Sequence, residues 1–477
     1  MYAIHFIERP SIVTRGDKSL LIFPESQVVV GLSTSFASIF AGRNTITSDE
    51  ITSSLHEGRQ HDNNQAHERL FIISQTFAKL GVTKNGESTN RHTRHGSSRT
   101  VDHAVLNLSI TERCNLECPH CYSSAGRSAS NKRELGTQEI IRLLDQYSEV
   151  GRGRETTDIA ITGGEPFLRS DLIEILRHCI DLQEKGLFTR VMLNTNGVNV
   201  NAESARFLAS TGVHIAVSVD GSKPATHEII RGKGTFRRTL RGIRELVEAG
   251  AWVGVNMFAH ADNVHDIEAT IELSIQLGVR AFTCFNLLSV GRANVSNKNN
   301  RLPMRICDSQ LYRIQHEILL RRPEFLDLMK DSLYVSQIRR IRARVPTRCG
   351  IGRHPTFYVR SNGDIYPCLA IFSQRFRVGN ALDEKWPTLW STHSCYKELA
   401  STDQTKSNIP CSVCEVRRFC GGGCFGENVQ LSGKLSPPHN SCIELKAGLI
   451  ELMWILSENP PYLRRLLPYS TSEELPS

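Results

Sequence analysis

Short apolar segments recur between residues 104 and 300, and each is followed by a stretch with helical periodicity. Strands that alternate with helices in this way form a parallel sheet. The pattern predicts an α/β fold whose sheet closes partly or wholly into a barrel. The expected strands are VLNLSI (105–110), DIAITG (158–163), RVMLNTNG (190–197), HIAVSVDG (214–221), WVGVNMF (252–258) and RAFTCFN (280–286).

The first 82 residues have a different pattern. Three strand-like runs, SIVTR, SLLIF and QVVVG, are separated by turn-forming residues. Helical patterns follow at residues 35–41, 48–56 and 69–80. Three strands followed by three helices predict a small winged-helix unit over residues 1–82.

Residues 83–103 begin with TKNGESTNRHTRHGSSRT, which contains almost no apolar residue. Such a polar stretch predicts a flexible linker, because it cannot bury enough apolar surface to fold. We therefore expect the N-terminal unit and the barrel to be separate structures that fail independently.

The composition is that of an ordinary globular protein with room for two or three domains: 477 residues, 40% hydrophobic and 22% charged. The N-terminus lacks the basic and apolar regions of a signal peptide, and no apolar run reaches the roughly 18 to 20 residues that span a bilayer. We expect a cytoplasmic protein without membrane contact. In that reducing compartment, fourteen cysteines indicate metal or catalytic roles rather than disulfides.

The net charge of +8 is modest, and much of it lies in a basic helical connector over residues 301–348. Between Lys298 and Arg348, twelve Lys and Arg residues stand against five Asp and Glu residues. This surplus fits a solvated helix face, with a docking surface for an acidic partner as the alternative.

Three cysteines, Cys114, Cys118 and Cys121, lie close together directly after the first barrel strand. Thiolates bind soft metals, and an iron-sulfur cubane takes up to four of them. Three cysteines leave one iron open to hold a substrate or cofactor. The alternative is a structural zinc site, for which His120 would be the fourth ligand.

Unusual clusters also follow the next three strands. They are Gly163-Gly164-Glu165-Pro166, Asn194-Thr195-Asn196-Gly197 and Ser218-Val219-Asp220-Gly221. Barrel chemistry takes place at the carboxyl ends of the strands, so these clusters and the cysteines are expected to share one site.

With these motifs in this order, the chain from Ala104 onward resembles the radical S-adenosylmethionine (SAM) enzymes. The resemblance implies a partial (β/α)6 barrel over residues 104–300 and a [4Fe-4S] cluster on Cys114, Cys118 and Cys121. The open iron of that cluster chelates SAM, and reductive cleavage gives a 5′-deoxyadenosyl radical. SAM contacts are implied for the exposed backbone of the GGEP motif and for three further residues. The full set is Gly163, Gly164, Glu165, Pro166, Asn194, Ser218 and Arg231.

The later cysteines resemble a SPASM domain, here spanning residues 349–445 and followed by a C-terminal helix and tail at 446–477. The resemblance implies two auxiliary [4Fe-4S] clusters, which makes three clusters in all. Cys349, Cys368 and Cys424 would hold auxiliary cluster I, and Cys411, Cys414, Cys420 and Cys442 would hold auxiliary cluster II. A zinc ribbon is the alternative for the pairs in CSVC and CGGGC.

Auxiliary cluster I lacks an obvious fourth ligand, because RIRARVPTR before Cys349 contains no cysteine. Either this cluster has an open iron, or a distant cysteine such as Cys307 reaches it. Cys179, Cys284 and Cys395 are expected to be small buried residues.

The N-terminal unit resembles the leader-recognition domains that are fused to peptide maturases and related to the chaperone of pyrroloquinoline quinone biosynthesis. In those domains a leader peptide adds to the third strand and lies against the last helix. The equivalent groove here lies between residues 27–31 and 69–80. Winged-helix units also bind DNA, but the apolar last helix and the lack of a dense basic stripe argue against nucleic acid.

Together the resemblances imply a radical SAM peptide maturase that acts on a ribosomally made precursor, with a reducing partner such as flavodoxin or ferredoxin. A thioether crosslink is the first choice of product, because an auxiliary cluster with an open iron can bind a substrate cysteine. A carbon-carbon crosslink is the second choice. Oxidation of a protein cysteine or serine, as in anaerobic sulfatase maturation, is the third, since Leu369 stands where those relatives have an acidic base. A zinc-binding scaffold or regulator is the alternative of another class.

Overall fold

The computed structural model describes residues 3–47, 50, 73–83, 102–126, 133–294, 305–344, 351, 354–383, 385–403 and 409–466. Apart from residue 50, the helix predicted at 48–56 lies outside the described residues. The same holds for residues 84–101 of the predicted linker and for Cys349.

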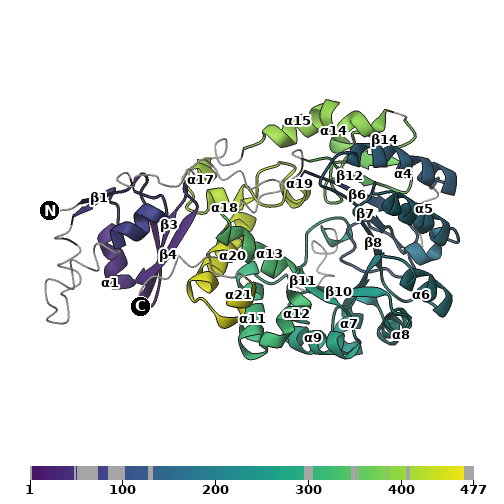
Figure 1. Ribbon diagram of the computed structural model, residues 1–477, viewed down its shortest axis with the longest axis horizontal. Coiled ribbons are helices and arrows are strands. Elements are labelled where there is room, and N and C mark those ends of the chain that lie inside the picture. The colour runs from purple at the N-terminus through teal and green to yellow at the C-terminus, as the bar shows by residue number, and fades with distance from the viewer. Residues whose placement is uncertain are drawn as a thin grey trace.

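All the predicted barrel strands are present, and they form a parallel sheet in the order β11-β10-β9-β8-β7-β6. They are β6 (His103–Ser109), β7 (Thr156–Thr162), β8 (Arg190–Thr195), β9 (His214–Ser218), β10 (Trp252–Ala259) and β11 (Ala281–Asn286). The other edge of β6 pairs in parallel with β12 (Thr356–Val359) rather than with β11. The barrel is therefore open, as the arc of strands in Figure 1 shows.

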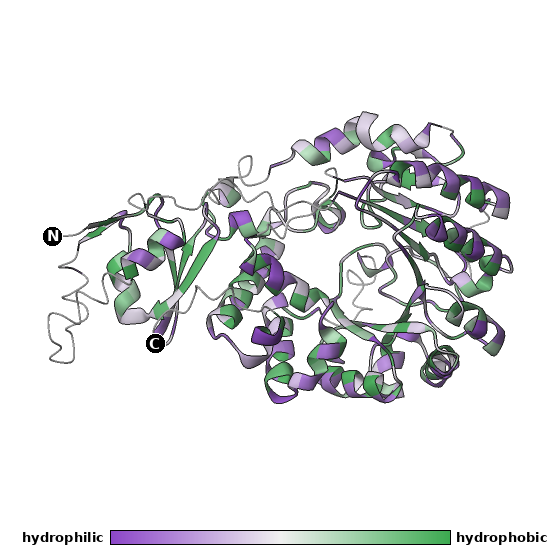
Figure 2. Ribbon diagram, in the orientation of Figure 1, coloured by the Kyte–Doolittle hydropathy of each residue, from purple (hydrophilic) through white to green (hydrophobic). Residues whose placement is uncertain are grey.

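Helices cover the outer face of this sheet (Figure 1). Helix α8 shows why: Phe236, Leu240, Ile243 and Leu246 recur at helical spacing and are buried, so one stripe of the helix packs on the sheet. Figure 2 shows the same contrast, with hydrophobic strands inside and hydrophilic helix faces outside. The helices are α4 (Thr137–Gly151), α5 (Leu172–Glu184), α6 (Ala202–Ala209), α7 (Pro224–Arg231), α8 (Thr235–Glu248) and α9 (Ile267–Gln276), with short 3-10 turns η3 (Pro166–Leu168) and η4 (Val264–Asp266).

An antiparallel meander extends the sheet beyond β6, and the sequence pattern did not predict it. After β12, the strands β13 (Asp364–Tyr366) and β14 (Gly379–Asn380) each pair with the strand before them. Phe357, Val359 and Ile365 are fully buried in the main core. The region C-terminal to the barrel is thus joined to it through a continuous sheet.

The N-terminal unit contains the three predicted strands as an antiparallel sheet in the order β2-β3-β4. They are β2 (Ser11–Arg15), β3 (Lys18–Phe23) and β4 (Val28–Ser33), and they are followed by α1 (Thr34–Ala37) and the 3-10 turn η1 (Ser38–Phe40). An unpredicted pair, β1 (Ala3–His5) and β5 (Thr45–Thr47), is also present. Residues 73–79 are helical, in agreement with the pattern at 69–80.

A cluster of phenylalanines forms the core of this unit. Phe6, Phe23, Phe40 and Phe77 are buried, and their ring contacts have centroid separations between 5.3 and 6.1 Å. The helix at residues 73–79 is therefore packed on the sheet through Phe77.

The N-terminal unit is packed against the rest of the chain, so the expectation of a separate structure is wrong. Alternate residues of β3 face two cores: Leu21 and Phe23 lie in the core of the unit, whereas Leu20 and Ile22 lie in the main core. The second face meets α20 (His439–Ser457). Gly31 on β4 approaches Ser457 so closely that an added Cβ would lie 3.1 Å from the Cβ of Ser457. Apolar burial on a neighbouring helix explains why the unit is not free.

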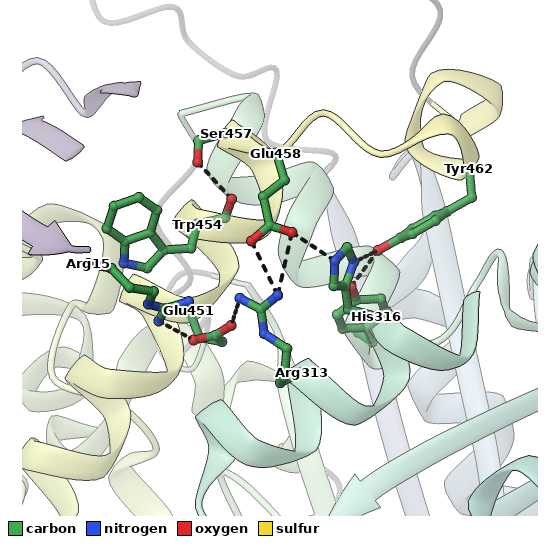
Figure 3. A network of polar contacts seen from close by, with 9 residues as sticks. Arg15, Arg313, His316, Glu451, Trp454, Ser457, Glu458 and Tyr462 are labelled. Atoms are coloured by element: carbon green, nitrogen blue, oxygen red, sulfur yellow. Dashed lines mark hydrogen bonds and ion pairs between the residues drawn. The ribbon is translucent and has the colours of Figure 1, made fainter. Parts of the chain in front are cut away.

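Polar contacts reinforce this docking, and Figure 3 shows them from close by. Arg15 on β2 donates from Nη2 to Oε2 of Glu451 at 2.6 Å, and its guanidinium lies 5.0 Å from the ring centroid of Trp454. Glu451 also pairs with Arg313 of the connector. Because Glu451 and Trp454 both lie on α20, the helix joins the N-terminal unit to the connector.

The same network continues into the interior (Figure 3). His316, 1% exposed, bonds Glu458 through Nε2 at 2.9 Å and the hydroxyl of Tyr462 through Nδ1 at 2.7 Å. Tyr462 bonds the hydroxyl of Tyr334 at 2.8 Å. The C-terminal helices are therefore fixed to the connector by buried polar groups.

The connector is helical, as predicted: α11 (Asp308–Arg321), the 3-10 turn η5 (Pro323–Phe325), α12 (Leu326–Met329) and α13 (Leu333–Arg342). The predicted boundary at residue 445 is wrong, since α20 runs through it and carries Cys442 within the helix. The other C-terminal elements are the 3-10 turns η6 (Gln374–Phe376) and η7 (Trp386–Thr388) and the helices α14 (Leu389–Thr392), α15 (Ser394–Ser401), α17 (Ile409–Ser412), α18 (Arg417–Cys420), α19 (Phe425–Ser432) and α21 (Pro461–Leu466). Within the described residues, we find no helix of the length and apolarity needed to cross a bilayer.

Candidate active site and auxiliary cysteine sites

The loop that carries Cys114, Cys118 and Cys121 follows β6 at the carboxyl end of the sheet. The structure brings the three thiols together closely enough that Cys118 and Cys121 influence Cys114. Burial, with Glu165 and the two other thiols, raises the pKa of Cys114 to about 12. Burial also raises the pKa of Cys118, against the opposing charge of Arg231. The free thiols of Cys114 and Cys118 are therefore protonated, and they become ligands only when a metal displaces their protons.

The GGEP segment after β7 holds this loop through its backbone. Gly164 donates to the carbonyl of Thr111 at 2.7 Å, and Glu165 donates to the carbonyl of Arg113 at 2.9 Å. A Cβ on Gly163 would lie 2.6 Å from the oxygen of Thr111, and one on Gly164 would overlap the carbonyl of Arg113. The expectation that this backbone is exposed needs correction, since Gly163 is buried and Gly164 is half-buried. The glycines are needed because the cysteine loop occupies the space of their side chains.

Glu165 links the ends of β7 and β8. Its carboxylate accepts the hydroxyl of Thr195 at 2.7 Å and the N–H of Asn196 at 2.8 Å. It also accepts the N–H of Phe167 at 3.1 Å, at the start of the 3-10 turn that begins with Pro166. Burial raises the pKa of Glu165, although these hydrogen bonds oppose the shift. Glu165 therefore positions both loops around the cysteines.

In the third cluster, Asn196 contacts the cysteine loop. Its amide donates to Asn115 Oδ1 at 2.8 Å and lies 4.0 Å from the Cys114 sulfur. Asn194, which the resemblance singled out, lies half-buried in β8 opposite Ala216. The sequence analysis assigned a role to Asn194 in this segment and none to Asn196.

Two further residues that the sequence analysis missed, Gly291 and Arg292, lie in the loop after β11. A Cβ on Gly291 would overlap the carbonyl of Tyr122. Arg292 donates to the carbonyls of Cys118, at 2.8 Å, and Ala125, and its own N–H bonds the carbonyl of Cys121 at 2.9 Å. The last barrel loop therefore clamps the cysteine loop. The sequence signal was a Gly-Arg pair in the loop that follows a strand.

A buried ion pair lies beside the thiols, in the fourth cluster. Arg231 donates from Nε to Oδ2 of Asp220 at 2.6 Å, and Asp220 is fully buried. Burial alone would raise the pKa of Asp220, but the charge and hydrogen bond of Arg231 together with His120 and His227 outweigh it, and the pKa is lowered. Ser218 lies half-buried at the end of β9, two residues before Asp220. Asp220 was quoted in the sequence motif without a role, and the structure gives it one.

The residues around the thiols fit a cofactor with a carboxylate. Nη2 of Arg231 is buried and has no hydrogen-bond partner, although its guanidinium lies close enough to Cys118 to lower the pKa of that thiol. A buried guanidinium with a spare donor suits a carboxylate. Nδ1 of His120 is also buried without a partner. Burial, followed by the charge of Arg231, lowers the pKa of His120 to about 3.

Among the described residues, no three His, Cys, Asp or Glu side chains are close enough together to hold one metal ion. A structural zinc would draw its sulfur ligands to about 2.3 Å, whereas the thiols of a cubane bind different irons.

The four cysteines predicted for auxiliary cluster II line one pocket. Cys411, Cys414 and Cys420 come from α17, α18 and the turn between them, and Cys442 comes from α20. Burial raises the pKa of Cys420 to about 11, with Cys414 and Cys442 contributing. Arg417, Lys446 and apolar residues complete the lining.

Two of the residues predicted for auxiliary cluster I lie in segments that touch: Cys368 lies in a loop, and Cys424 directly precedes α19. Ala370, two residues after Cys368, packs against Gly426, two residues after Cys424, so that a Cβ on Gly426 would overlap Ala370. The third, Cys349, lies outside the described residues. Cys307, the suggested fourth ligand, is exposed. Cys179, Cys284 and Cys395 are buried, as predicted.

Comparisons with known proteins agree with these sites. The Radical SAM superfamily profile matches residues 108–274, and that of the SPASM iron-sulfur cluster-binding domain matches residues 349–415. The chain is 28% identical to the AdoMet-dependent heme synthase of Methanosarcina barkeri over 66% of this chain and 88% of that protein. It is 26% identical to the mycofactocin maturase MftC of Mycolicibacterium smegmatis over 71% and 82%.

The fold resembles that of Streptococcus suis SuiB bound to S-adenosylmethionine, with a TM-score of 0.55 and 15% identity over 91% of this chain and 97% of SuiB. SuiB has also been solved bound to the precursor peptide SuiA. The chain therefore contains a Radical SAM domain over residues 108–274 and a SPASM iron-sulfur cluster-binding domain over residues 349–415.

Proposed function

We propose that this enzyme modifies a ribosomally synthesised precursor peptide or protein whose leader docks on the N-terminal unit. The observation that carries the proposal is the position of β4. In the described part of the chain, β4 pairs with β3 alone, so one edge is open to an extended peptide. Added strands bind such edges through backbone hydrogen bonds, with side-chain pockets for specificity. The docking groove lies between β4 and the helix at residues 73–79.

The relatives support a peptide substrate. MftC is named as a maturase, and SuiB has been solved with a precursor peptide. The likeness to SuiB covers 91% of this chain, so it extends beyond the barrel and the SPASM domain. Nucleic acid and membrane have no part in the proposal.

In the proposed site, Cys114, Cys118 and Cys121 hold the first [4Fe-4S] cluster, and its open iron binds SAM. When bound, SAM supplies the radical that removes a hydrogen atom from the substrate. Arg231 offers its free donor to the SAM carboxylate, and carbonyls of the Gly163–Pro166 segment accept the ammonium. Asn194 and Ser218 complete the cofactor pocket, and Glu165 fixes its walls through Thr195 and Asn196.

Two auxiliary [4Fe-4S] clusters complete the proposal. Cys411, Cys414, Cys420 and Cys442 hold the distal one, because they already line one pocket. Cys349, Cys368 and Cys424 hold the nearer one. With three protein ligands, the nearer cluster has room for a substrate thiol, so a thioether is the preferred product. A carbon-carbon crosslink follows, and a sulfatase-type oxidation comes last. A flavodoxin or ferredoxin is the expected electron donor.

The test is a reaction of the reconstituted enzyme with SAM, dithionite and a candidate precursor, taken from a short open reading frame beside the gene. A thioether or carbon-carbon crosslink removes two hydrogen atoms from the peptide, which mass spectrometry detects. Fragmentation then distinguishes a sulfur bridge from a carbon bridge. A cysteine-to-alanine precursor should lose the first product and keep the second. SAM cleavage without any change in leader-bearing peptides would contradict the proposal.

Heme synthesis is the second candidate, because it is the activity named for the M. barkeri relative at 28% identity. That likeness covers 66% of this chain, and it assigns no role to a peptide-binding edge on β4. An assay for heme formation, run beside the peptide assay, separates the two candidates. Heme formation would favour the second.

A further inference from the structure

The turn between β3 and β4 is fixed on both sides. The carboxylate of Glu8 accepts the N–H groups of Glu25 and Ser26 at 2.7 and 2.6 Å. Gln27, the last residue before β4, has a φ of 54°, which is unusual for a residue other than glycine. Its side chain donates to the carbonyl of Arg418 on α18 at 3.2 Å. The turn therefore holds a defined position against the C-terminal region.

Glu25, at the tip of this turn, faces two arginines. Its Oε1 accepts Nε and Nη2 of Arg417 at 3.0 and 2.6 Å, and its Oε2 accepts Nε of Arg418 at 2.8 Å. Burial acts to raise the pKa of Glu25, but the two arginines outweigh it, and the pKa is lowered. One carboxylate thus compensates two guanidinium groups.

Arg417 carries this contact into the distal cysteine site. Its Nη1 donates to the carbonyl of Cys414 at 2.8 Å, and its side chain lines the pocket of the four cysteines. Arg417 also begins α18, which ends at Cys420. Arg417 therefore connects a carboxylate of the N-terminal unit to the segment that carries two predicted cluster ligands, Cys414 and Cys420. Figure 1 shows α18 between the N-terminal unit and the barrel.

We propose that Glu25 is a positioning residue for auxiliary cluster II: it holds the Cys414–Cys420 segment through Arg417 and compensates the positive charge beside the cluster. The inference rests on the proposed assignment of that cluster to Cys411, Cys414, Cys420 and Cys442. The potential of an iron-sulfur cluster depends on net charge and hydrogen bonding around it. A reduced cluster carries more negative charge, so uncompensated arginines favour reduction. The N-terminal unit is on this account part of the electron-transfer site as well as a docking module.

The test is an EPR-monitored redox titration of the full-length reconstituted protein at low ionic strength, where exposed charges are least screened. The component that disappears in Cys442→Ala belongs to the distal site. Glu25→Gln should shift the midpoint potential of this component to a more positive value. Arg417→Gln should shift it to a more negative value, and the double variant should return towards the wild type.

Glu398→Gln is the matched control, because Glu398 has the same 46% exposed side chain as Glu25 and pairs with Arg375 at 3.0 Å. It should leave the potential unchanged. Unchanged potentials in both Glu25→Gln and Arg417→Gln would overturn the inference while the proposed peptide chemistry stands. If no EPR component depends on Cys442, the cluster assignment itself fails, and the inference falls with it.

Discussion

The buried pair between Arg231 and Asp220 gives the sharpest test of the candidate site. Arg231→Met removes the charge and keeps an apolar stem of similar length, which leaves the carboxylate of Asp220 buried. Oδ1 of Asp220 would still accept the N–H of Phe258 at 2.8 Å. Removing one member of a buried pair costs about 3–5 kcal/mol in the free energy of unfolding. For a domain of 150–250 residues, that corresponds to a melting temperature lower by about 6 to 20 °C.

The pH dependence identifies the cause. In the wild type the pKa of Asp220 is lowered, so its contribution to stability is present above the unfolded pKa of about 3.9 and is lost as pH falls through the folded value. Without Arg231, burial dominates and raises the folded pKa. The variant then binds a proton on folding, and its stability falls as pH rises. The difference from the wild type is therefore smallest below the folded pKa of Asp220, and it grows as pH rises towards 7.

Urea denaturation followed by tryptophan fluorescence measures the free energy of unfolding across this pH range. Arg237→Met is the control, because Arg237 is exposed on the neighbouring helix α8, and it should change stability by less than about 0.5 kcal/mol. Asp220→Asn combined with Arg231→Met should be less destabilised than Arg231→Met alone. A loss below about 1 kcal/mol at pH 7, without dependence on pH, would refute the reasoning. On the account above, Arg231→Met also weakens SAM binding while the iron content is retained.

Three other changes test other parts of the structure. Gly291→Ala places a Cβ against the carbonyl of Tyr122, so it should lower the iron bound by the Cys114 loop. Iron analysis in a Cys442→Ala background, where the distal site no longer contributes, measures this, and full iron retention would contradict the contact. Deleting residues 1–82 uncovers the apolar face of α20, so the truncated protein should aggregate or melt several degrees lower. Size-exclusion chromatography and calorimetry measure these changes. A monomer with an unchanged melting temperature would show that the N-terminal unit is an independent module. Burial lowers the pKa of His316, although Glu458 opposes the shift, so the folded protein resists protonation of His316 and loses stability below pH 6.5. His316→Gln should make this loss smaller in urea denaturation. An unchanged pH profile would exclude His316 as the cause.

The barrel was predictable because each of its strands is a continuous or alternating apolar run. Segments such as DIAITG and HIAVSVDG are buried on the sheet and end in the residues that surround the cysteines. In these segments, the period of the apolar residues predicted the strand, and the position of the polar cluster at the end of the strand predicted the site. The strands β13 and β14 are three and two residues long, so they have too few positions to show any period.

Contacts between distant segments were not predictable. The alternation in SLLIF indicates a strand but does not say that Leu20 and Ile22 face a helix more than 400 residues later. Asn196 and Arg292 were missed for a related reason. Their roles come from hydrogen bonds to Asn115 and to the carbonyls of the cysteine loop, and those partners are set by the closed fold rather than by local sequence.

The measurement that tests the central claim most directly is the iron and acid-labile sulfide content of anaerobically reconstituted protein, together with SAM cleavage. The account predicts three clusters, and therefore about twelve irons per chain, with 5′-deoxyadenosine formed on reduction. In a protein with Cys114, Cys118 and Cys121 all changed to alanine, it predicts the loss of about four irons and of all SAM cleavage, while the auxiliary signals remain. Zinc in place of iron, or SAM cleavage that survives the triple change, would contradict it.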